Sequence, residues 1–282
     1  MFYMSNIIET QFELQGKVKD INAVKQELES DNLAIDFNKL IPMPKSLDIS
    51  KNSNEYFNIV CSFIRKNGNE IPSLDWLTKQ PVLKPDKTLT DFLGENYLTE
   101  LLMNVIGRCK NSSQKVIDEA ADIGDILIDN FEKYGATTWY DWCYANWGTK
   151  WNAMEVELSE VFGNEDNDTF ASGFIQTANA CPIPILEKIS DICSKHSVRI
   201  TGIYADEGSA SYTGIFTNQI KDGKFYITDD LTKEQHNRIF RWIWDYDPEY
   251  DEDNENSTDA YDPNDTFDVK ECLQLLTATT DE

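Results

Sequence analysis

The spacing of hydrophobic residues changes twice along this chain, and the two changes divide it into three parts. Hydrophobic and polar residues alternate over residues 7–14 and 33–41, which predicts two half-buried strands. Residues 18–28, between them, have the spacing of an amphipathic helix. Because proline cannot continue a central strand, Pro42 and Pro44 end the second one. The first part therefore predicts a β–α–β arrangement.

The middle part has helical spacing throughout. Hydrophobic residues recur at positions i, i+3, i+4 and i+7 over residues 56–65, 97–109 and 114–134. Gly135 follows the last of these segments, and glycine in that position is typical of a helix C-terminus. This part predicts a block of helices.

The helical block ends in a segment rich in tryptophan. It contains four of the seven tryptophans of the chain: Trp139, Trp142, Trp147 and Trp151. Trp139 and Trp142 are three residues apart and Trp147 and Trp151 are four apart, so each of these two pairs can share a helical face. Gly148 allows the chain to turn after Trp147. The rings predict either an aromatic plug between two layers of the fold or a binding surface, because tryptophan is common in both.

Strand patterns return after Trp151. The third part predicts the order β–β–α–β–β–β, with strands over residues 154–162, 169–177, 198–205, 209–217 and 224–227 and a helix over residues 185–196. Asp222 and Gly223 predict the turn before the last strand. A basic and aromatic stretch follows over residues 236–244, and a short closing helix is predicted over residues 269–276.

Charge limits the function classes. Fifty acidic residues against 25 basic ones give a net charge of −25, which argues against binding to a nucleic-acid backbone. The charge is compatible with simple solubility, a partner with a basic surface, or cation binding. Residues 245–268 contain eleven acidic residues and no basic ones, and predict a loosely attached tail. Its candidate binding residues are Asp245, Asp247, Glu249, Asp251, Glu252 and Asp253.

Other sequence features predict a cytoplasmic protein without metal or cofactor. No apolar run reaches the length of about 18 residues that a membrane span needs, and the N-terminus lacks the pattern of a secretory signal. The six cysteines show no CxxC spacing, so they predict free, partly buried thiols and no structural zinc. No nucleotide-binding or hydrolase motif is present, and the chain is predicted to be no enzyme.

Three short motifs are candidate sites for a ligand or a cation. Asp206 and Glu207 precede Gly208 and predict either a hairpin turn or part of a cation site. Lys150 lies beside Trp151 and is expected either to support a tight turn or to form a cation–π contact. The tail begins like a calcium loop at Asp251. A calcium loop starting there would have Asn256 in place of its glycine and Asp262 in place of its final glutamate. An EF-hand is therefore not expected.

Four ordered blocks of sequence resemble one family. They are IDFNKLIPMP at 35–44, TTWYDWCYANWGTKWNA at 137–153, TANACPIPILEKIS at 177–190 and YADEGSASYTG at 204–214. Together they resemble the Api92-like family, which carries a YubB-type ferredoxin-like domain and occurs in phages, plasmids and other mobile elements. The chain departs from the family pattern at residues 5–7 and 179–181. No cysteine run suited to an iron–sulfur cluster is present.

The resemblance implies an α+β fold. The expected form is a ferredoxin-like sandwich, an antiparallel sheet with helices on one face, with a large helical insertion after the second strand. The expected parts are residues 1–48 and 154–230 for the two halves of the sandwich, 49–153 for the insertion and 231–282 for an aromatic helix with the acidic tail.

Three functions remain open on the sequence. The first is a non-enzymatic accessory protein of a phage or mobile element, an anti-defence inhibitor whose acidic surface mimics nucleic acid and binds a basic surface on a host or defence protein in the cytoplasm. Carboxylates in rows about 6–7 Å apart would support such mimicry. The alternative is an aromatic-lined module for a peptide or small ligand at the tryptophans. The third is a metal-dependent hydrolase or nuclease that uses Asp206 and Glu207. Neither direct nucleic-acid binding nor a membrane is expected.

Overall fold

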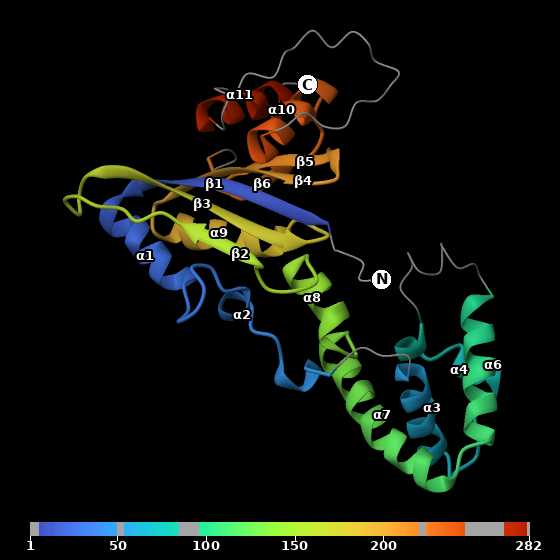
Figure 1. The fold of residues 1–282 in the computed structure, drawn as a ribbon. Coiled ribbons are helices and arrows are strands. Elements are labelled where there is room, and N and C mark those ends of the chain that lie inside the picture. The colour runs from blue at the N-terminus through green and yellow to red at the C-terminus, as the bar shows by residue number, and fades with distance from the viewer. Residues whose placement is uncertain (1–5, 50–53, 85–95, 220–223, 246–267, 281–282) are drawn as a thin grey trace. The chain divides into compact units, whose positions relative to one another are not determined.

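The chain folds into two compact units. The computed structural model describes residues 6–49, 54–84, 96–219, 224–245 and 268–280 (Figure 1). Residues Met1–Pro42 and Cys143–Glu282 form one unit, which we call the sheet unit, and Met43–Trp142 form the other, which we call the helical unit. Strands and helices together make this an α+β protein. None of the described helices combines the length and hydropathy needed to cross a membrane.

A six-stranded antiparallel sheet forms the centre of the sheet unit. Its strands are β1 (Ile7–Lys17), β2 (Glu155–Leu158), β3 (Asp168–Ala178), β4 (Arg199–Asp206), β5 (Ser209–Thr217) and β6 (Tyr226–Thr228). Their order across the sheet is β2-β3-β1-β4-β5-β6. The predicted strands over residues 169–177, 198–205 and 209–217 thus form β3, β4 and β5. The turn predicted at Asp222 and Gly223 lies outside the described residues.

Two helices, α1 (Val18–Leu28) and α9 (Ile183–Lys195), pack on one face of this sheet (Figure 1). Alternate residues of β1 are buried, because every second side chain of a strand points to the same face. The buried hydrophobic residues of this layer are Ile8, Phe12, Leu14, Ile21, Val24, Leu28, Ile175, Ile185, Leu186, Ile189 and Phe216. This apolar layer is the core that fixes the position of β1 and β3.

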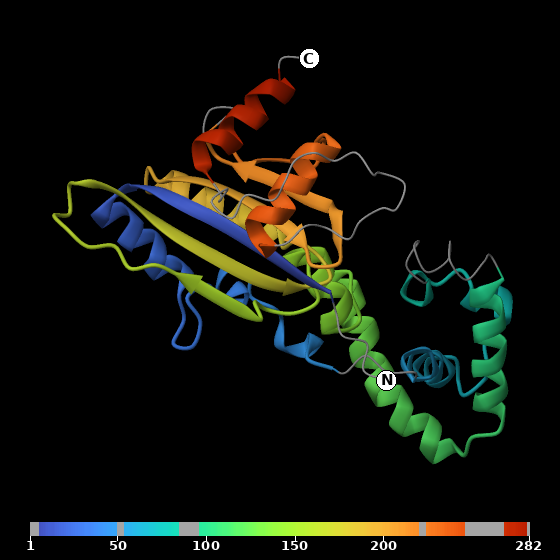
Figure 2. The same cartoon turned by 45° about the horizontal axis from the view of Figure 1, so that its top comes forward.

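The opposite face carries α10 (Lys233–Trp244) and α11 (Val269–Thr280) over β4 and β5 (Figure 1 and Figure 2). Their hydrophobic cluster consists of Ile203, Ala205, Ile215, Ile239, Phe240, Trp242, Ile243, Cys272 and Leu276. Thr232 begins α10 with a reciprocal capping box to Gln235, and Arg238 of α10 forms an ion pair with Glu271 of α11. The expectation of helices on one face is therefore wrong, whereas the predicted closing helix is confirmed as α11.

The strand predicted over residues 33–41 is also wrong. Phe37–Leu40 form a short helix, α2, which Asp36 caps by accepting a hydrogen bond from the backbone N–H of Asn38 at 2.9 Å. Phe37 and Leu40 are both buried, because three residues along a helix return to the same side. The second strand in chain order is β2, so the helical unit precedes the second strand instead of following it.

The helical unit has its own apolar core. Its helices are α3 (Glu55–Lys66), α4 (Leu74–Leu77), α6 (Tyr97–Lys110) and α7 (Gln114–Tyr134), with single turns at Lys45–Leu47 and Pro81–Leu83. The core lies mainly between α3, α6 and α7 and includes Ile59, Val60, Leu102, Ala121 and Leu127. The helix α8 (Trp139–Trp147) follows and contains the boundary between the two units.

All six cysteines are buried thiols outside any disulfide, which confirms the prediction of thiols. The Sγ atoms of Cys61 and Cys109 lie 4.0 Å apart inside the helical unit. Burial raises the pKa of Cys143 to about 11 and that of Cys193 to about 12, because the apolar surroundings disfavour the thiolate. These two thiols are therefore core residues of low reactivity.

Candidate functional site

One half of the sheet leaves a face of polar and aromatic side chains uncovered by α10 and α11. We call it the open face; it consists of Glu9, Gln11, Glu13 and Gln15 on β1, Phe170, Ser172, Phe174 and Gln176 on β3, and Glu155 and Glu157 on β2. Gln11 pairs with Ile203, which lies in the cluster under α10 and α11. The open face therefore points to the same side of the sheet as these two helices.

Exposure and charge distinguish the open face from the rest of the sheet. Phe170 is 61% exposed, Glu155, Glu157 and Ser172 are exposed, and the remaining side chains are half-buried. Four of its ten residues are glutamates. The basic residues Lys17 and Arg199 lie at one end, where Lys17 pairs with Asp168 and Arg199 with Gln15. The rows between carry acidic, amide, hydroxyl and aromatic groups.

Side-chain amides orient two of the glutamates. Glu9 accepts a hydrogen bond at each carboxylate oxygen, from Nε2 of Gln11 at 2.9 Å and from Nε2 of Gln176 at 2.8 Å. Glu13 accepts one from Nε2 of Gln15 at 2.6 Å. Such hydrogen bonds restrict the rotamers of a carboxylate. The negative charges of β1 are therefore held in place on the open face.

The strand geometry sets the spacing of the charges. Glu155 and Glu157 are two residues apart on β2, so their Cα atoms lie about 6.8 Å apart. Glu155, Gln176 and Glu9 stand in one row across three strands, which places the two glutamates about 9.6 Å apart. The first of these Cα spacings lies in the range of about 6–7 Å along a strand that phosphate mimicry needs.

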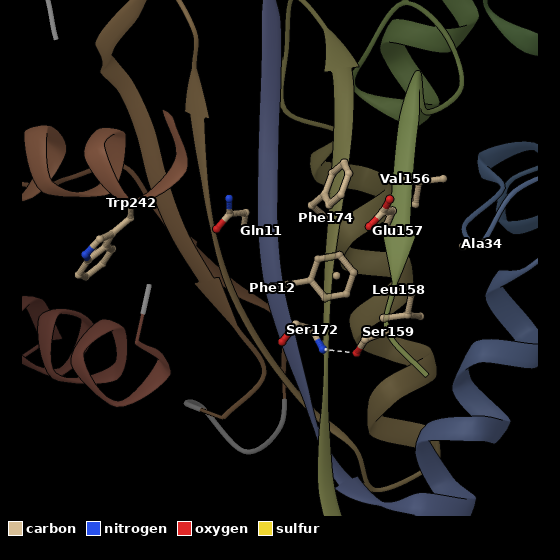
Figure 3. A pocket seen from close by; sticks show the side chains of 11 residues that line it. Gln11, Phe12, Ala34, Val156, Glu157, Leu158, Ser159, Ser172, Phe174 and Trp242 are labelled. Carbon is tan, nitrogen blue, oxygen red and sulfur yellow. Dashed lines mark hydrogen bonds between the residues drawn. The ribbon is translucent and has the colours of Figure 1, made fainter. Parts of the chain in front are cut away.

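A hollow of about 800 Å³ lies on this half of the sheet (Figure 3). On the open face it is lined by Gln11, Glu157, Ser172 and Phe174, together with Trp242 of α10. It also reaches Phe12, Val156 and Leu158, which point to the other face of the sheet, and Ala34. Gly173 points to the opposite face, where a Cβ would lie 2.6 Å from the ring of Phe12. The hollow therefore has lining residues on both faces of this edge of the sheet, and Phe174 borders it on the open face.

Two of the four tryptophans are buried, one is half-buried and one is exposed. Trp142 and Trp147 are buried, and they belong to different units. The indole N–H of Trp147 donates to the carbonyl oxygen of Ile41 at 2.9 Å, and its ring meets Phe37 edge-on at 6.1 Å. Trp139 is half-buried and makes an edge contact with Tyr140. Burial of two rings favours the plug interpretation for Trp142 and Trp147.

The chain after α8 turns tightly, as the sequence predicts. Gly148 has φ of +77°, and a Cβ there would lie 2.7 Å from Cδ of Pro184, so the position requires glycine. Lys150 places its Nζ 4.1 Å from the ring centre of Trp151, a cation–π contact. Trp151 is 37% exposed. Both expected roles of Lys150 are therefore compatible with its position.

Asp206 and Glu207 hold the hairpin between β4 and β5. Asp206 is buried and accepts a hydrogen bond from the backbone N–H of Gly208 at 2.6 Å. Glu207 accepts one from the backbone N–H of Ile7 at 2.9 Å. These contacts favour the turn interpretation. Across the described part of the chain, no three His, Cys, Asp or Glu side chains come together as a group able to hold a metal ion.

Only the first and last residues of the acidic segment over 245–268 are described. Asp245 is exposed and ends α10 with a left-handed backbone, φ +56°. The other candidates of that segment, Asp247, Glu249, Asp251, Glu252 and Asp253, lie outside the described residues.

The open face did not follow from the hydrophobic pattern alone. The polar positions of β1 alternate with its buried ones, and Glu155 and Glu157 alternate with Val156 and Leu158. This alternation is the sequence signal that predicts a polar face on each of these two strands. The sequence did not show that β2, β3 and β1 are neighbours, which is what brings the four glutamates together.

Comparisons with known proteins give one distant likeness. No protein-family model and no curated protein match the chain. Among solved structures, the crystal structure of a protein api92 from Yersinia pseudotuberculosis, assigned to the family model DUF1281, is similar over 80% of this chain and 98% of that chain. The identity is 8% and the TM-score 0.33, which supports only a distant structural relationship.

Proposed function

We propose that this chain is a non-enzymatic binding protein and that its open face binds a partner with a basic, nucleic-acid-binding groove. The observation that carries the proposal is the collection of four glutamates, two of them oriented by amide donors, on the half of the sheet that α10 and α11 leave open. A basic groove complements such a surface, and the net charge of −25 would accelerate the encounter.

A protein partner fits this face better than nucleic acid does. Phosphates would be repelled by the glutamates, because binding to a nucleic-acid backbone depends on lysine and arginine. A basic groove that normally holds phosphates would instead meet the carboxylates of Glu155 and Glu157, whose Cα atoms lie about 6.8 Å apart on β2. The exposed ring of Phe170 adds apolar area of the kind that anchors protein interfaces.

We also infer that the sheet unit is an enlarged ferredoxin-like sandwich. The order β2-β3-β1-β4, with α1 and α9 packed on one face, supports this inference. The helical unit is then an insertion between α1 and β2, and β5, β6, α10 and α11 are additions at one edge. This arrangement explains why the added helices cover only half of the second face.

The proposal is tested by titrating a short peptide of alternating arginine and glycine into the full chain. We compare the wild type with an open-face variant, in which Glu9, Glu13, Glu155 and Glu157 are all changed to glutamine. The variant should bind about tenfold more weakly at low salt, because four partly exposed ion pairs are lost. Binding to the wild type should also weaken as salt is added.

A charge-matched control separates location from total charge. It carries Glu187→Gln and Asp191→Asn on α9, together with Asp129→Asn and Glu132→Gln on α7; all four side chains are exposed. This control should bind the peptide as the wild type does. Equal weakening of both variants would mean that only the overall charge attracts the peptide, and the proposal would be wrong.

A further inference from the structure

We propose that the open face takes an arginine side chain of the partner, with the guanidinium stacked on the Phe174 ring between the surrounding carboxylates. This inference deepens the proposed function and rests on it. It names the chemical group that the centre of the face recognises.

Phe174 lies at the centre of the four glutamates. Glu157 on β2 and Gln11 on β1 are its direct cross-strand partners. The other three glutamates occupy diagonal positions: Glu9, Glu13 and Glu155. Direct partners have Cβ atoms about 4.5–5.5 Å apart and diagonal ones about 7–8 Å apart. All four carboxylates are therefore within a side chain's reach of one aromatic ring.

The ring can be reached from solvent. Phe174 is half-buried and lines the hollow of about 800 Å³ together with Gln11, Glu157 and Ser172. Figure 3 shows the Phe174 ring beside the Glu157 side chain on the neighbouring strand, with Trp242 of α10 beyond Gln11. The hollow thus combines an aromatic surface with a carboxylate at its edge.

This combination suits arginine better than other side chains. A guanidinium is planar, stacks on an aromatic face and can form two parallel hydrogen bonds to one carboxylate. Lysine offers a more strongly hydrated point charge without the planar stack. The chain forms the same kind of stack internally, where the guanidinium carbon of Arg238 lies 4.9 Å from the ring centre of Trp242.

The test uses a capped glycine–arginine–glycine peptide and backbone NMR of the full chain. The arginine peptide should cause saturable shifts of the amides around Phe174, Glu157 and Gln11. The Phe174→Leu variant should lower its affinity about fivefold, since the cation–π contact is lost and an apolar side chain is kept. Phe162→Leu, at a phenylalanine that is 84% exposed and outside the open face, should leave the affinity unchanged. Melting curves of both variants check that they fold.

The outcomes separate this inference from the proposed function. The citrulline version of the peptide, which has the same shape without charge, should give no saturable shifts, and the lysine version should bind more weakly than the arginine version. Equal affinity of wild type and Phe174→Leu, or equal binding of the lysine version, would overturn the arginine site. If the alternating arginine–glycine peptide still distinguishes the open-face variant from its control, the proposed function stands while the arginine site fails. If that peptide does not bind the wild type, both fail.

Discussion

Replacing Gly202 with alanine should destabilise the sheet unit by about 3 kcal/mol, at the upper end of the cost of overpacking a core. Gly202 lies on β4 opposite Phe12 of β1 and Phe216 of β5. A Cβ there would lie 2.5 Å from the carbonyl oxygen of Gln11 and would overlap the ring of Phe216. The backbone of β1 cannot move away without breaking its ladder, so the strain remains in the centre of the sheet.

Thermal unfolding measured by circular dichroism checks this prediction, and a fall in Tm of about 6–12 °C is expected. Gly208→Ala is the control, because its nearest neighbours are side-chain atoms of Asp206 and Asn6 at 3.3 Å or more. A Gly202→Ala protein that melts with the wild type would show that the packing of Phe12 and Phe216 around this glycine is looser than described.

Gly124→Ala should destabilise the helical unit by about 2 kcal/mol. A Cβ on Gly124 would overlap the backbone carbonyl group of Asn58, so α7 and α3 would have to separate. Overpacking against backbone costs about 3 kcal/mol, and the better helix propensity of alanine offsets about 1 kcal/mol of this. The lost stability is that of the apolar core that contains Ile59, Val60 and Leu127.

Hydrogen exchange should localise the two effects. Gly124→Ala should lower protection in α3 and α7, and Gly202→Ala should lower it in β1, β4 and β5, because each unit has its own core. Gly107→Ala in α6 is the matched control, since no atom of the described residues lies within 4 Å of its added Cβ, and it should stabilise the protein slightly. Loss of protection throughout the chain in both variants would show one cooperative unit instead.

Local spacing predicted most elements of this fold. The alternation around Phe12 and the helical spacing around Leu127 are properties of single segments, and these segments adopt the expected structure. The prediction failed at Phe37, where apolar residues over 33–41 fit both a strand and a short capped helix. Asn152, far along the chain, stabilises the helix, because its Oδ1 accepts a hydrogen bond from the backbone N–H of Phe37 at 3.0 Å.

The candidate site depended still more on distant pairing. Glu9 and Glu157 are far apart in the sequence, and only the order β2-β3-β1 brings them to one surface. The tryptophans and the Asp206–Glu207 pair are locally unusual, and the sequence therefore predicted candidate sites there. The structure instead gives Trp147 a packing role and gives Asp206 and Glu207 backbone contacts at the start of a hairpin.

The central claim is that the open face occupies a groove that otherwise holds nucleic acid. The most direct measurement takes a basic nucleic-acid-binding protein captured by the full chain, loads it with a fluorescent oligonucleotide and follows release of the oligonucleotide as the chain is added. We predict that the wild type and the charge-matched control release it, and that the open-face variant with four glutamines does not. Release by all three proteins, or a complex that holds the chain and the oligonucleotide together, would contradict the claim.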